Sequence, residues 1–199
     1  MTSNNISLDH RIIADFVKEG STVLDLGCGR GKLMLLLENI KKAKVQGIEI
    51  DEKAIYECVA GGLSVFHGDI DTGLSEYKDK SFDYVILNQS LQEVRRPDPV
   101  LSEALRVGHN VIVGFPNFAC WKGRWQLSCR GRAPVTLSLP YEWHDTPNLH
   151  FLSIKDFFEY CKKRNIIIQK SVFITKNSRV NIWPNLFADN GIFLIKAKS

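Results

Sequence analysis

The sequence predicts a doubly wound α/β domain built on a mostly parallel sheet. Short, continuously apolar runs alternate with segments of helical periodicity, as in sheets that helices cover on both faces. A cluster of glycines also joins the first apolar run directly to a helical segment. The 199 residues, 44% of them hydrophobic, suit a single domain over residues 1–199 that can bury a sizeable core.

The first predicted helix covers residues 8–19, where apolar side chains recur at helical spacing and Gly20 follows as a stop signal. Residues 23–26 then suit a buried strand, and the glycine turn follows. A second helix at 32–41 carries apolar residues at i, i+3, i+4 and i+7, which gives one stripe to pack on the sheet. The next expected elements are a strand at 45–50, a helix at 52–60, strands at 63–67 and 82–87, a helix at 97–105 and a strand at 111–115.

The alternation of strands and helices breaks in residues 116–150, a stretch rich in Trp, Arg and Pro. It is too long for an ordinary connection, and its aromatic residues argue against disorder. We interpret it as an insertion after the fifth strand that acts as a lid over the sheet edge or as a partner-binding segment. A nucleic-acid groove with stacking aromatics is the less favoured alternative, because the net charge of +4 is mild and the basic residues are scattered.

Beyond this insertion the sequence predicts a helix and two further strands. Ser153 can cap a helix that runs to Arg164, and residues 166–174 read as a strand. Asn190-Gly191 is expected to turn the chain into a last strand at 192–197. We expect the last two strands to be antiparallel at the edge of the sheet.

Composition favours a cytoplasmic protein that binds neither a metal nor a membrane. The amino-terminal residues are polar, which predicts no signal peptide, and no apolar run reaches membrane-spanning length. The cysteines form no C-x-x-C pair and lie in no metal-ligand pattern, as expected of free thiols in a reducing compartment. They are Cys28, Cys58, Cys120, Cys129 and Cys161.

The glycine turn and two acidic residues after it predict a nucleoside site. Gly27, Gly29 and Gly31 follow the spacing G-x-G-x-G instead of the dinucleotide fingerprint G-x-G-x-x-G, which disfavours an NAD enzyme. Glu49 ends the second strand, where its carboxylate can accept hydrogen bonds from both ribose hydroxyls, and Ile50 could pack on an adenine face. Asp69 follows the third strand and could accept from an exocyclic amine. Three successive strands thus end at one ligand-binding edge.

With these features the chain resembles the class I S-adenosylmethionine-dependent methyltransferases, which have a Rossmann-like fold. Asp25 to Gly31 is similar to their first motif, and Asn88-Gln89-Ser90 follows the fourth strand, where that superfamily lines the methionine end of the cofactor. The resemblance implies S-adenosylmethionine or S-adenosylhomocysteine as ligand. The implied cofactor-binding residues are Asp25, Gly27, Cys28, Gly29, Gly31, Glu49, Ile50, Asp69, Ile70, Asn88 and Gln89.

Four longer motifs, at residues 87–92, 115–118, 130–136 and 139–150, resemble the methionine-biosynthesis protein family MetW. The resemblance implies an accessory protein that binds and activates homoserine O-acyltransferase. This chain has no Gly-x-Ser-x-Gly elbow and so lacks the nucleophile for acyl transfer itself. Arg30 and Lys32 stand where acidic or small residues are expected in that family.

The alternative is a small-molecule methyltransferase, so the sequence leaves open whether the chain is an enzyme. Asn117, Tyr141 or His144 could orient an acceptor, because methyl transfer can proceed largely by alignment. We favour a structural role for His144 in the turns around Pro140 and Pro147. Neither an Asn-Pro-Pro-Tyr sequence nor a Pro-Cys nucleophile of nucleic-acid methyltransferases is present.

Overall fold

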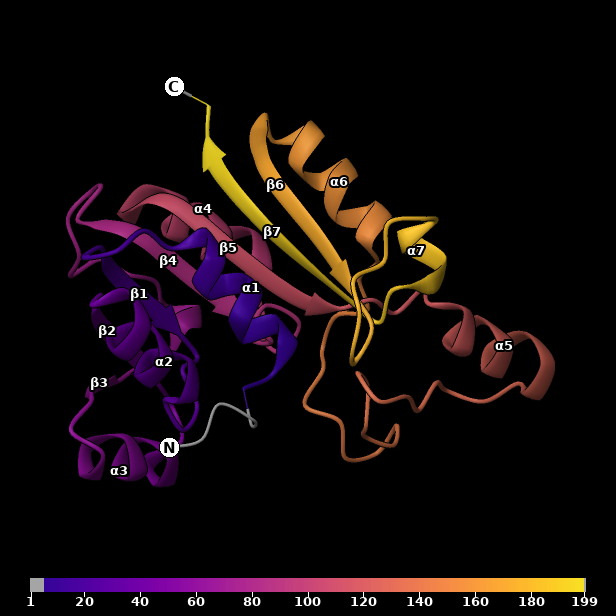
Figure 1. The fold of residues 1–199 in the computed structure, drawn as a ribbon. Helices are drawn as coiled ribbons and strands as arrows, with labels where there is room; N and C mark the ends of the chain where they lie inside the picture. The colour runs from indigo at the N-terminus through magenta and orange to yellow at the C-terminus, as the bar shows by residue number, and fades with distance from the viewer. Residues whose placement is uncertain (1–5, 199) are drawn as a thin grey trace.

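The computed structural model describes residues 6–198 and has one seven-stranded sheet of order β3-β2-β1-β4-β5-β7-β6 (Figure 1). Strands β1 to β5 are parallel, and β7 is antiparallel to both of its neighbours. The predicted fold class, a mostly parallel sheet with an antiparallel edge, is confirmed.

The predicted strands and helices are all present with similar bounds, and η2, α5 and α7 are additional helices that were not predicted. The strands are β1 (Thr22–Leu26), β2 (Lys44–Glu49), β3 (Ser64–His67), β4 (Phe82–Asn88), β5 (Gly108–Pro116), β6 (Ile166–Ile174) and β7 (Asn190–Ala197). The helices are α1 (Leu8–Phe16), α2 (Lys32–Lys41), α3 (Glu52–Ala60), the short 3₁₀ helix η2 (Ile70–Thr72), α4 (Pro97–Val107), α5 (Trp121–Arg130), α6 (Ile154–Lys163) and α7 (Pro184–Phe187).

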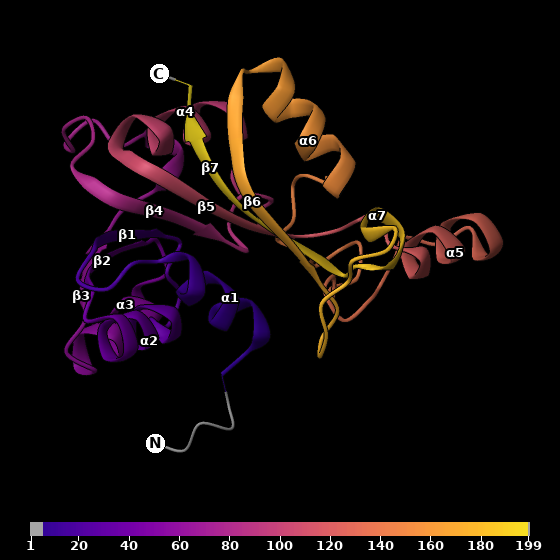
Figure 2. The same cartoon turned by 45° about the horizontal axis from the view of Figure 1, so that its top comes forward.

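The sheet is covered on both faces, which explains why its central strands are continuously apolar (Figure 2). Successive side chains of β4 enter opposite cores: Val85 and Leu87 pack with α4 and α6, whereas Tyr84 and Ile86 pack with α1, α2 and α3. Within residues 6–198 no helix is long and apolar enough to cross a membrane.

The first helix is shorter than predicted. It ends at Phe16 instead of residue 19, because Val17 is extended (φ −81°, ψ 131°) and turns its buried side chain into the core. Apolar spacing alone cannot separate the last helical residue from an extended residue that packs on the same core.

Asn190-Gly191 is not the turn that we predicted. Both residues lie within the β7 ladder, where Asn190 pairs with Pro116 and Ile174, so β6 and β7 are joined by a long connection containing α7. Gly191 serves close packing instead, since an added Cβ would lie 3.0 Å from a ring carbon of Phe193 and 3.1 Å from Ile154 Cγ1.

Helix α5 lies inside the insertion and was not predicted. It stands away from the sheet (Figures 1 and 2), and Gly123 is its only buried residue, so it carries no apolar stripe to reveal it. Its end does have a sequence signal: Gly131 is left-handed (φ 59°) and its N–H donates to helix carbonyls.

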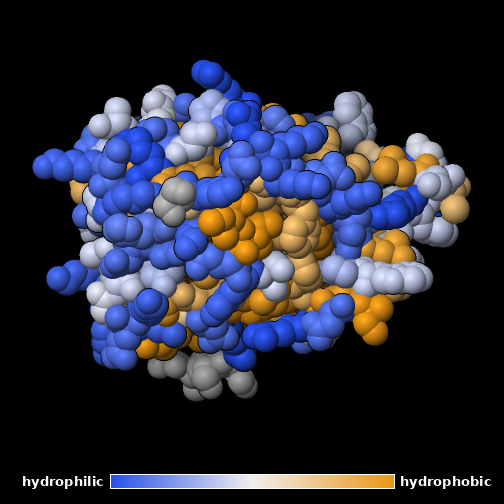
Figure 3. All heavy atoms as spheres, turned by 90° about the horizontal axis from the view of Figure 1, so that it is seen from above, coloured by the Kyte–Doolittle hydropathy of each residue, from blue (hydrophilic) through white to orange (hydrophobic). Residues whose placement is uncertain are grey.

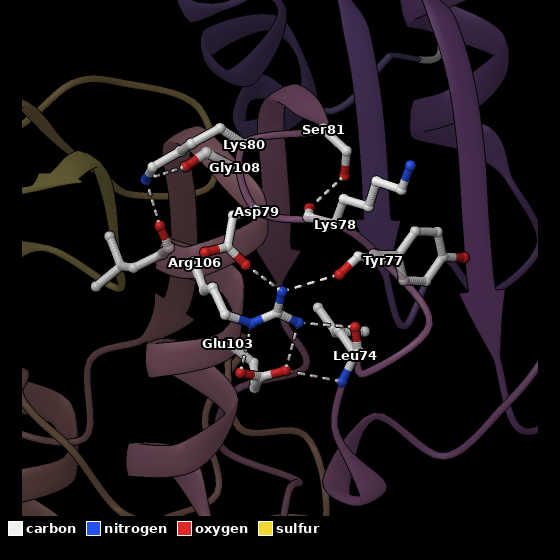
Figure 4. A network of polar contacts seen from close by, with 10 residues as sticks. Leu74, Tyr77, Lys78, Asp79, Lys80, Ser81, Glu103, Arg106 and Gly108 are labelled. Atoms are coloured by element: carbon white, nitrogen blue, oxygen red, sulfur yellow. Dashed lines mark hydrogen bonds and ion pairs between the residues drawn. The ribbon is translucent and has the colours of Figure 1, made fainter.

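The connection between β3 and β4 is fastened to α4 by Arg106 (Figure 4). Its guanidinium donates to the carboxylates of Glu103 and Asp79 at 2.7–2.8 Å and to the carbonyl oxygens of Leu74 and Tyr77 at 2.8 Å. These bonds, first to Glu103 and then to Asp79, raise the pKa of Arg106. The clamp fixes the segment that follows η2, and η2 lies just beyond the carboxyl end of β3.

Candidate functional site

The glycine turn between β1 and α2 needs its glycines for two reasons. Gly27 and Gly31 are left-handed, with φ of 76° and 69°. An added Cβ at Gly27 would also lie 2.8 Å from Ser90 Cβ, and one at Gly31 would collide with the side chain of Leu63. The backbone therefore passes close to its neighbours, and it leaves the end of β1 bordered by main chain instead of side chains.

Glu49 lies at the end of β2, as predicted, and backbone donors hold its carboxylate on both oxygens. The N–H of Gly29 donates to Oε2 at 2.7 Å, while the N–H groups of Ile50 and Asp51 donate to Oε1 at 2.8 and 3.0 Å. Charge-assisted bonds of this kind fix the direction of a carboxylate. The bond to Gly29 also ties Glu49 directly to the glycine turn.

A cavity of about 400 Å³ lies between the ends of β1, β2 and β4. Glu49, Ile50, Asp69, Ile70 and Gln89 line it together with backbone of the glycine turn, so the structure brings these predicted residues together. Ile50 offers an exposed apolar side chain at the wall, with 59% of its surface accessible. One oxygen of Asp69 accepts the N–H of Asp71 at 2.9 Å and thereby caps η2.

A second cavity, of about 270 Å³, adjoins the other side of the turn. Asp25, Asn88, His10 and Lys32 line it. Asp25 is buried, and its burial, followed by the charge of Glu49, raises its pKa to about 7. Asn88 Oδ1 is buried and has no hydrogen-bond partner among the described residues. Asn88 Oδ1 packs against Gly114 of β5, whereas the acid Asp25 suits a donor such as an ammonium group.

Helix α1 brings an acid–histidine pair to this region that sequence reasoning missed. Asn88 Nδ2 donates to Asp9 Oδ2 at 3.2 Å, and His10 Nε2 lies 4.0 Å from the same oxygen. Burial would raise the pKa of Asp9, but hydrogen bonds from Ser7 and Asn88 and the charge of His10 together hold it below its usual range. Burial lowers the pKa of His10. No motif marks this pair, because α1 precedes the glycine turn and its packing decides where the pair lies.

A third, open cavity of about 830 Å³ extends from α1 to the insertion. Asp9, Gln89, Gln92, Tyr141 and Asn190 are among the residues that line it. Gln89 has a left-handed backbone (φ 60°), and its side chain donates to Asn190 Oδ1 at 3.3 Å. Of the three weak catalytic candidates, only Tyr141 lines this cavity.

The other two candidates lie elsewhere. Asn117 is fully buried: its amide donates to the carbonyl oxygens of Asn185 and Ala188, and its Oδ1 accepts the N–H groups of Ala119 and Ile154. Its polar atoms are therefore engaged in joining β5 to the segments around α6 and α7.

His144 is exposed, with its Nδ1 lying 3.6 Å from Glu142 Oε2, and it lines none of the three cavities. Within residues 6–198 no group of three or more His, Cys, Asp or Glu side chains is placed to hold a metal ion.

A family model described as methionine biosynthesis protein MetW matches residues 7–195. The chain belongs to the MetW family. The bifunctional methionine biosynthesis protein MetXA/MetW of Rhodopirellula baltica is 32% identical to it over 200 residues, which cover 94% of this chain and 32% of that protein. The ribosomal protein L11 methyltransferase of Aquifex aeolicus is 34% identical over 88 residues, 43% of this chain and 36% of that enzyme. The MetW-family chain thus spans about a third of the length of these relatives.

Solved structures show the same fold. A methyltransferase from Archaeoglobus fulgidus, described as dependent on S-adenosylmethionine, superposes with a TM-score of 0.69 at 17% identity, covering 94% of this chain and 91% of that one. A structure of a putative methyltransferase with the Trm112 activator, from Haloferax volcanii, gives 0.67 at 18% identity, covering 92% and 85%. The MetW-family chain therefore has the class I methyltransferase fold, as predicted.

The insertion of this MetW-family chain also contributes to the first cavity. Leu149 lines it together with Ile50, and the N–H groups of Leu149 and His150 donate to the carbonyl oxygen of Gln92 at 2.8 and 3.0 Å. Sequence reasoning missed Leu149, because only the tertiary path of the insertion brings it back over the sheet.

Proposed function

We propose that this MetW-family chain binds S-adenosylmethionine or S-adenosylhomocysteine and acts as an accessory protein that binds and activates a homoserine O-acyltransferase. The identity of the partner is supported by the Rhodopirellula baltica relative, whose name joins a MetXA part to a MetW part in one polypeptide. Proteins that are fused in one organism commonly work together when they are separate chains in another. The chain belongs to a methionine-biosynthesis family, which agrees with a partner that acts on homoserine.

The cavities around the glycine turn support the ligand. Glu49 would accept hydrogen bonds from the ribose hydroxyls, and Ile50 would pack on the adenine. Asp25 would face the ammonium of the methionine part, and Lys32 would face its carboxylate. Arg30 also lines the second cavity, and it pairs with Glu57 at 3.5 Å, so its charge is partly compensated. The bound ligand would supply a sulfonium methyl group, or a thioether in the homocysteine form.

Regulation by the ligand requires that it bind free and partnered chain with different affinities. The ligand derives from methionine, the end product of the pathway, so its occupancy could report the level of that product. Leu149 and His150 belong to the insertion: Leu149 lines the cavity at Glu49 and Ile50, and the N–H groups of both residues donate to Gln92. A ligand in this cavity would therefore contact a residue of the insertion directly.

Co-purification with the acyltransferase of the same organism, followed by calorimetric titration of S-adenosylmethionine into the isolated chain, tests partner and ligand separately. We expect a stable complex and a saturable heat of ligand binding. Absence of a complex would contradict the accessory role, and absence of ligand heat would contradict the proposed ligand.

The open third cavity favours one alternative, a small-molecule methyltransferase. It adjoins Gln89 and Asn190, next to the expected methionine end of the ligand, and it has room for a polar acceptor. Release of S-adenosylhomocysteine upon incubation with defined metabolite pools would support this alternative. The accessory function predicts no such release.

A further inference from the structure

The end of the molecule formed by α5 and residues 131–151 exposes aromatic and basic side chains that the fold does not use. Trp143 is 78% exposed and Trp125 is 46% exposed. Figures 1 and 2 show α5 projecting from the sheet with α7 beside it, and Figure 3 shows apolar groups among hydrophilic ones at this end. Soluble monomers seldom leave large apolar side chains clustered in this way unless the cluster is a binding surface.

A cavity of about 300 Å³ opens between α5 and residues 133–151. Its walls are almost wholly apolar, and it can take one bulky side chain. Interfaces of proteins commonly place such an anchor residue in an apolar pocket near their centre. The main lining residues are Phe118, Leu127, Pro134, Leu139, Trp143 and Phe151.

Basic residues outnumber acidic ones around this cavity. Residues 118–151 contain four Lys and Arg residues and two acidic residues, Asp145 and Glu142, and Glu142 lines the cavity. Lys122 is compensated by Asp189 at 3.4 Å, but no carboxylate in the described part of the chain forms an ion pair with Arg124, Arg130 or Arg132. The guanidinium of Arg130 lies 4.3 Å from the ring centroid of Trp125, which holds both side chains at the surface.

We propose that this basic aromatic surface, made of α5 and residues 131–151, docks an acidic face of the partner acyltransferase that inserts a bulky apolar side chain into the cavity. The inference rests on the proposed function for the identity of the partner. Complementary charge would steer the encounter, and burial of Trp143 and the cavity walls would hold the complex. Single-stranded RNA fits less well, because Arg130 covers a face of Trp125 that a base would need for stacking.

Binding of the purified acyltransferase is measured by calorimetry for the unaltered chain and for three variants. Arg130→Glu/Arg132→Glu reverses the charge of the surface, and Trp143→Ala removes its most exposed aromatic residue. Lys196→Glu/Lys198→Glu makes the same change of charge at the opposite end of β7 and is the matched control. All the altered side chains are exposed, and circular dichroism verifies that each variant is folded.

We expect Kd to rise about 100-fold for the double arginine variant and about 30-fold for Trp143→Ala, while the control stays within about 3-fold. Equal binding by the double arginine variant and the unaltered chain would overturn the docking surface and leave the proposed function standing. No binding by the unaltered chain would overturn both. A single-stranded RNA of mixed sequence that binds as tightly as the acyltransferase, and only with Arg130 and Arg132 present, would replace the protein partner with RNA.

Discussion

At the scale of single residues, Glu49 carries most of the proposed ligand recognition. Both of its oxygens already accept backbone N–H groups. In Glu49→Gln an NH₂ group would replace one oxygen and face those donors, so both the ribose contact and the glycine turn would be disturbed. We expect S-adenosylmethionine to bind about 10- to 100-fold more weakly in calorimetry.

Glu52→Gln is the matched control for this variant, because Glu52 is exposed at the start of α3 and undergoes the same chemical change. It should leave Kd unchanged. If Kd is the same for Glu49→Gln and the unaltered chain, the Glu49 carboxylate does not contribute to ligand binding.

Asp25 predicts a dependence of stability on pH. Burial and then the charge of Glu49 raise its pKa from an ordinary value of 3.8 to about 7. Between these values the folded chain binds a proton that the unfolded chain has released, so this group makes the free energy of unfolding fall as pH rises. Above about pH 7 its contribution becomes constant. Urea unfolding of Asp25→Asn should show a weaker fall between about pH 5 and pH 7 than the unaltered chain.

An equal slope in the two proteins would show that Asp25 ionises normally in the folded chain. The window begins near pH 5 because other carboxyl groups change the stability at lower pH. Glu103 and Asp83 have lowered pKa values, so their stabilising contributions are lost in acid, below about pH 4.5.

The part of the site that lies close to strand ends was predictable from sequence. Glu49 and Asp69 follow apolar runs at spacings that topology places on one edge, and the cavity joins them. Asp9, His10 and Leu149 were missed, because they come from a helix and an insertion whose positions depend on tertiary packing.

At the scale of elements, the neighbours of the glycine turn leave no room for a side chain at Gly27 and Gly31. Gly27 and Gly20 have nearly the same left-handed φ, 76° and 72°, but only Gly27 has a close neighbour. We expect Gly20→Ala to lower the free energy of unfolding by about 1 kcal/mol and Gly27→Ala by about 2–4 kcal/mol. Chemical denaturation measures the free energy of unfolding of both variants. Equal decreases would show that Ser90 moves away from an added Cβ at Gly27 without a cost in stability.

The elements that sequence predicted well are those that pack on the sheet. Helix α2 was predicted with its bounds because its apolar stripe is regular, and the strands were found from their runs. Helix α5 has no such stripe, and Gly191 serves packing instead of a turn, so periodicity and turn rules could not identify either role.

At the scale of the whole molecule, the cavity at Glu49 and Ile50 and the basic aromatic surface share Leu149. Ligand and partner should therefore affect each other's binding, and linkage requires the two effects to be equal. If S-adenosylmethionine changes the Kd of the acyltransferase by some factor, the acyltransferase must change the Kd of S-adenosylmethionine by the same factor. Calorimetry in both orders measures the two values, and a factor of one would contradict regulation by the ligand.

The rate of the acyltransferase, measured as the chain is titrated into it, tests the central claim most directly. We predict a rate that rises and saturates with the concentration of the chain, while the Arg130→Glu/Arg132→Glu variant needs a higher concentration for the same effect. An acyltransferase rate that stays unchanged at saturating chain would contradict the account.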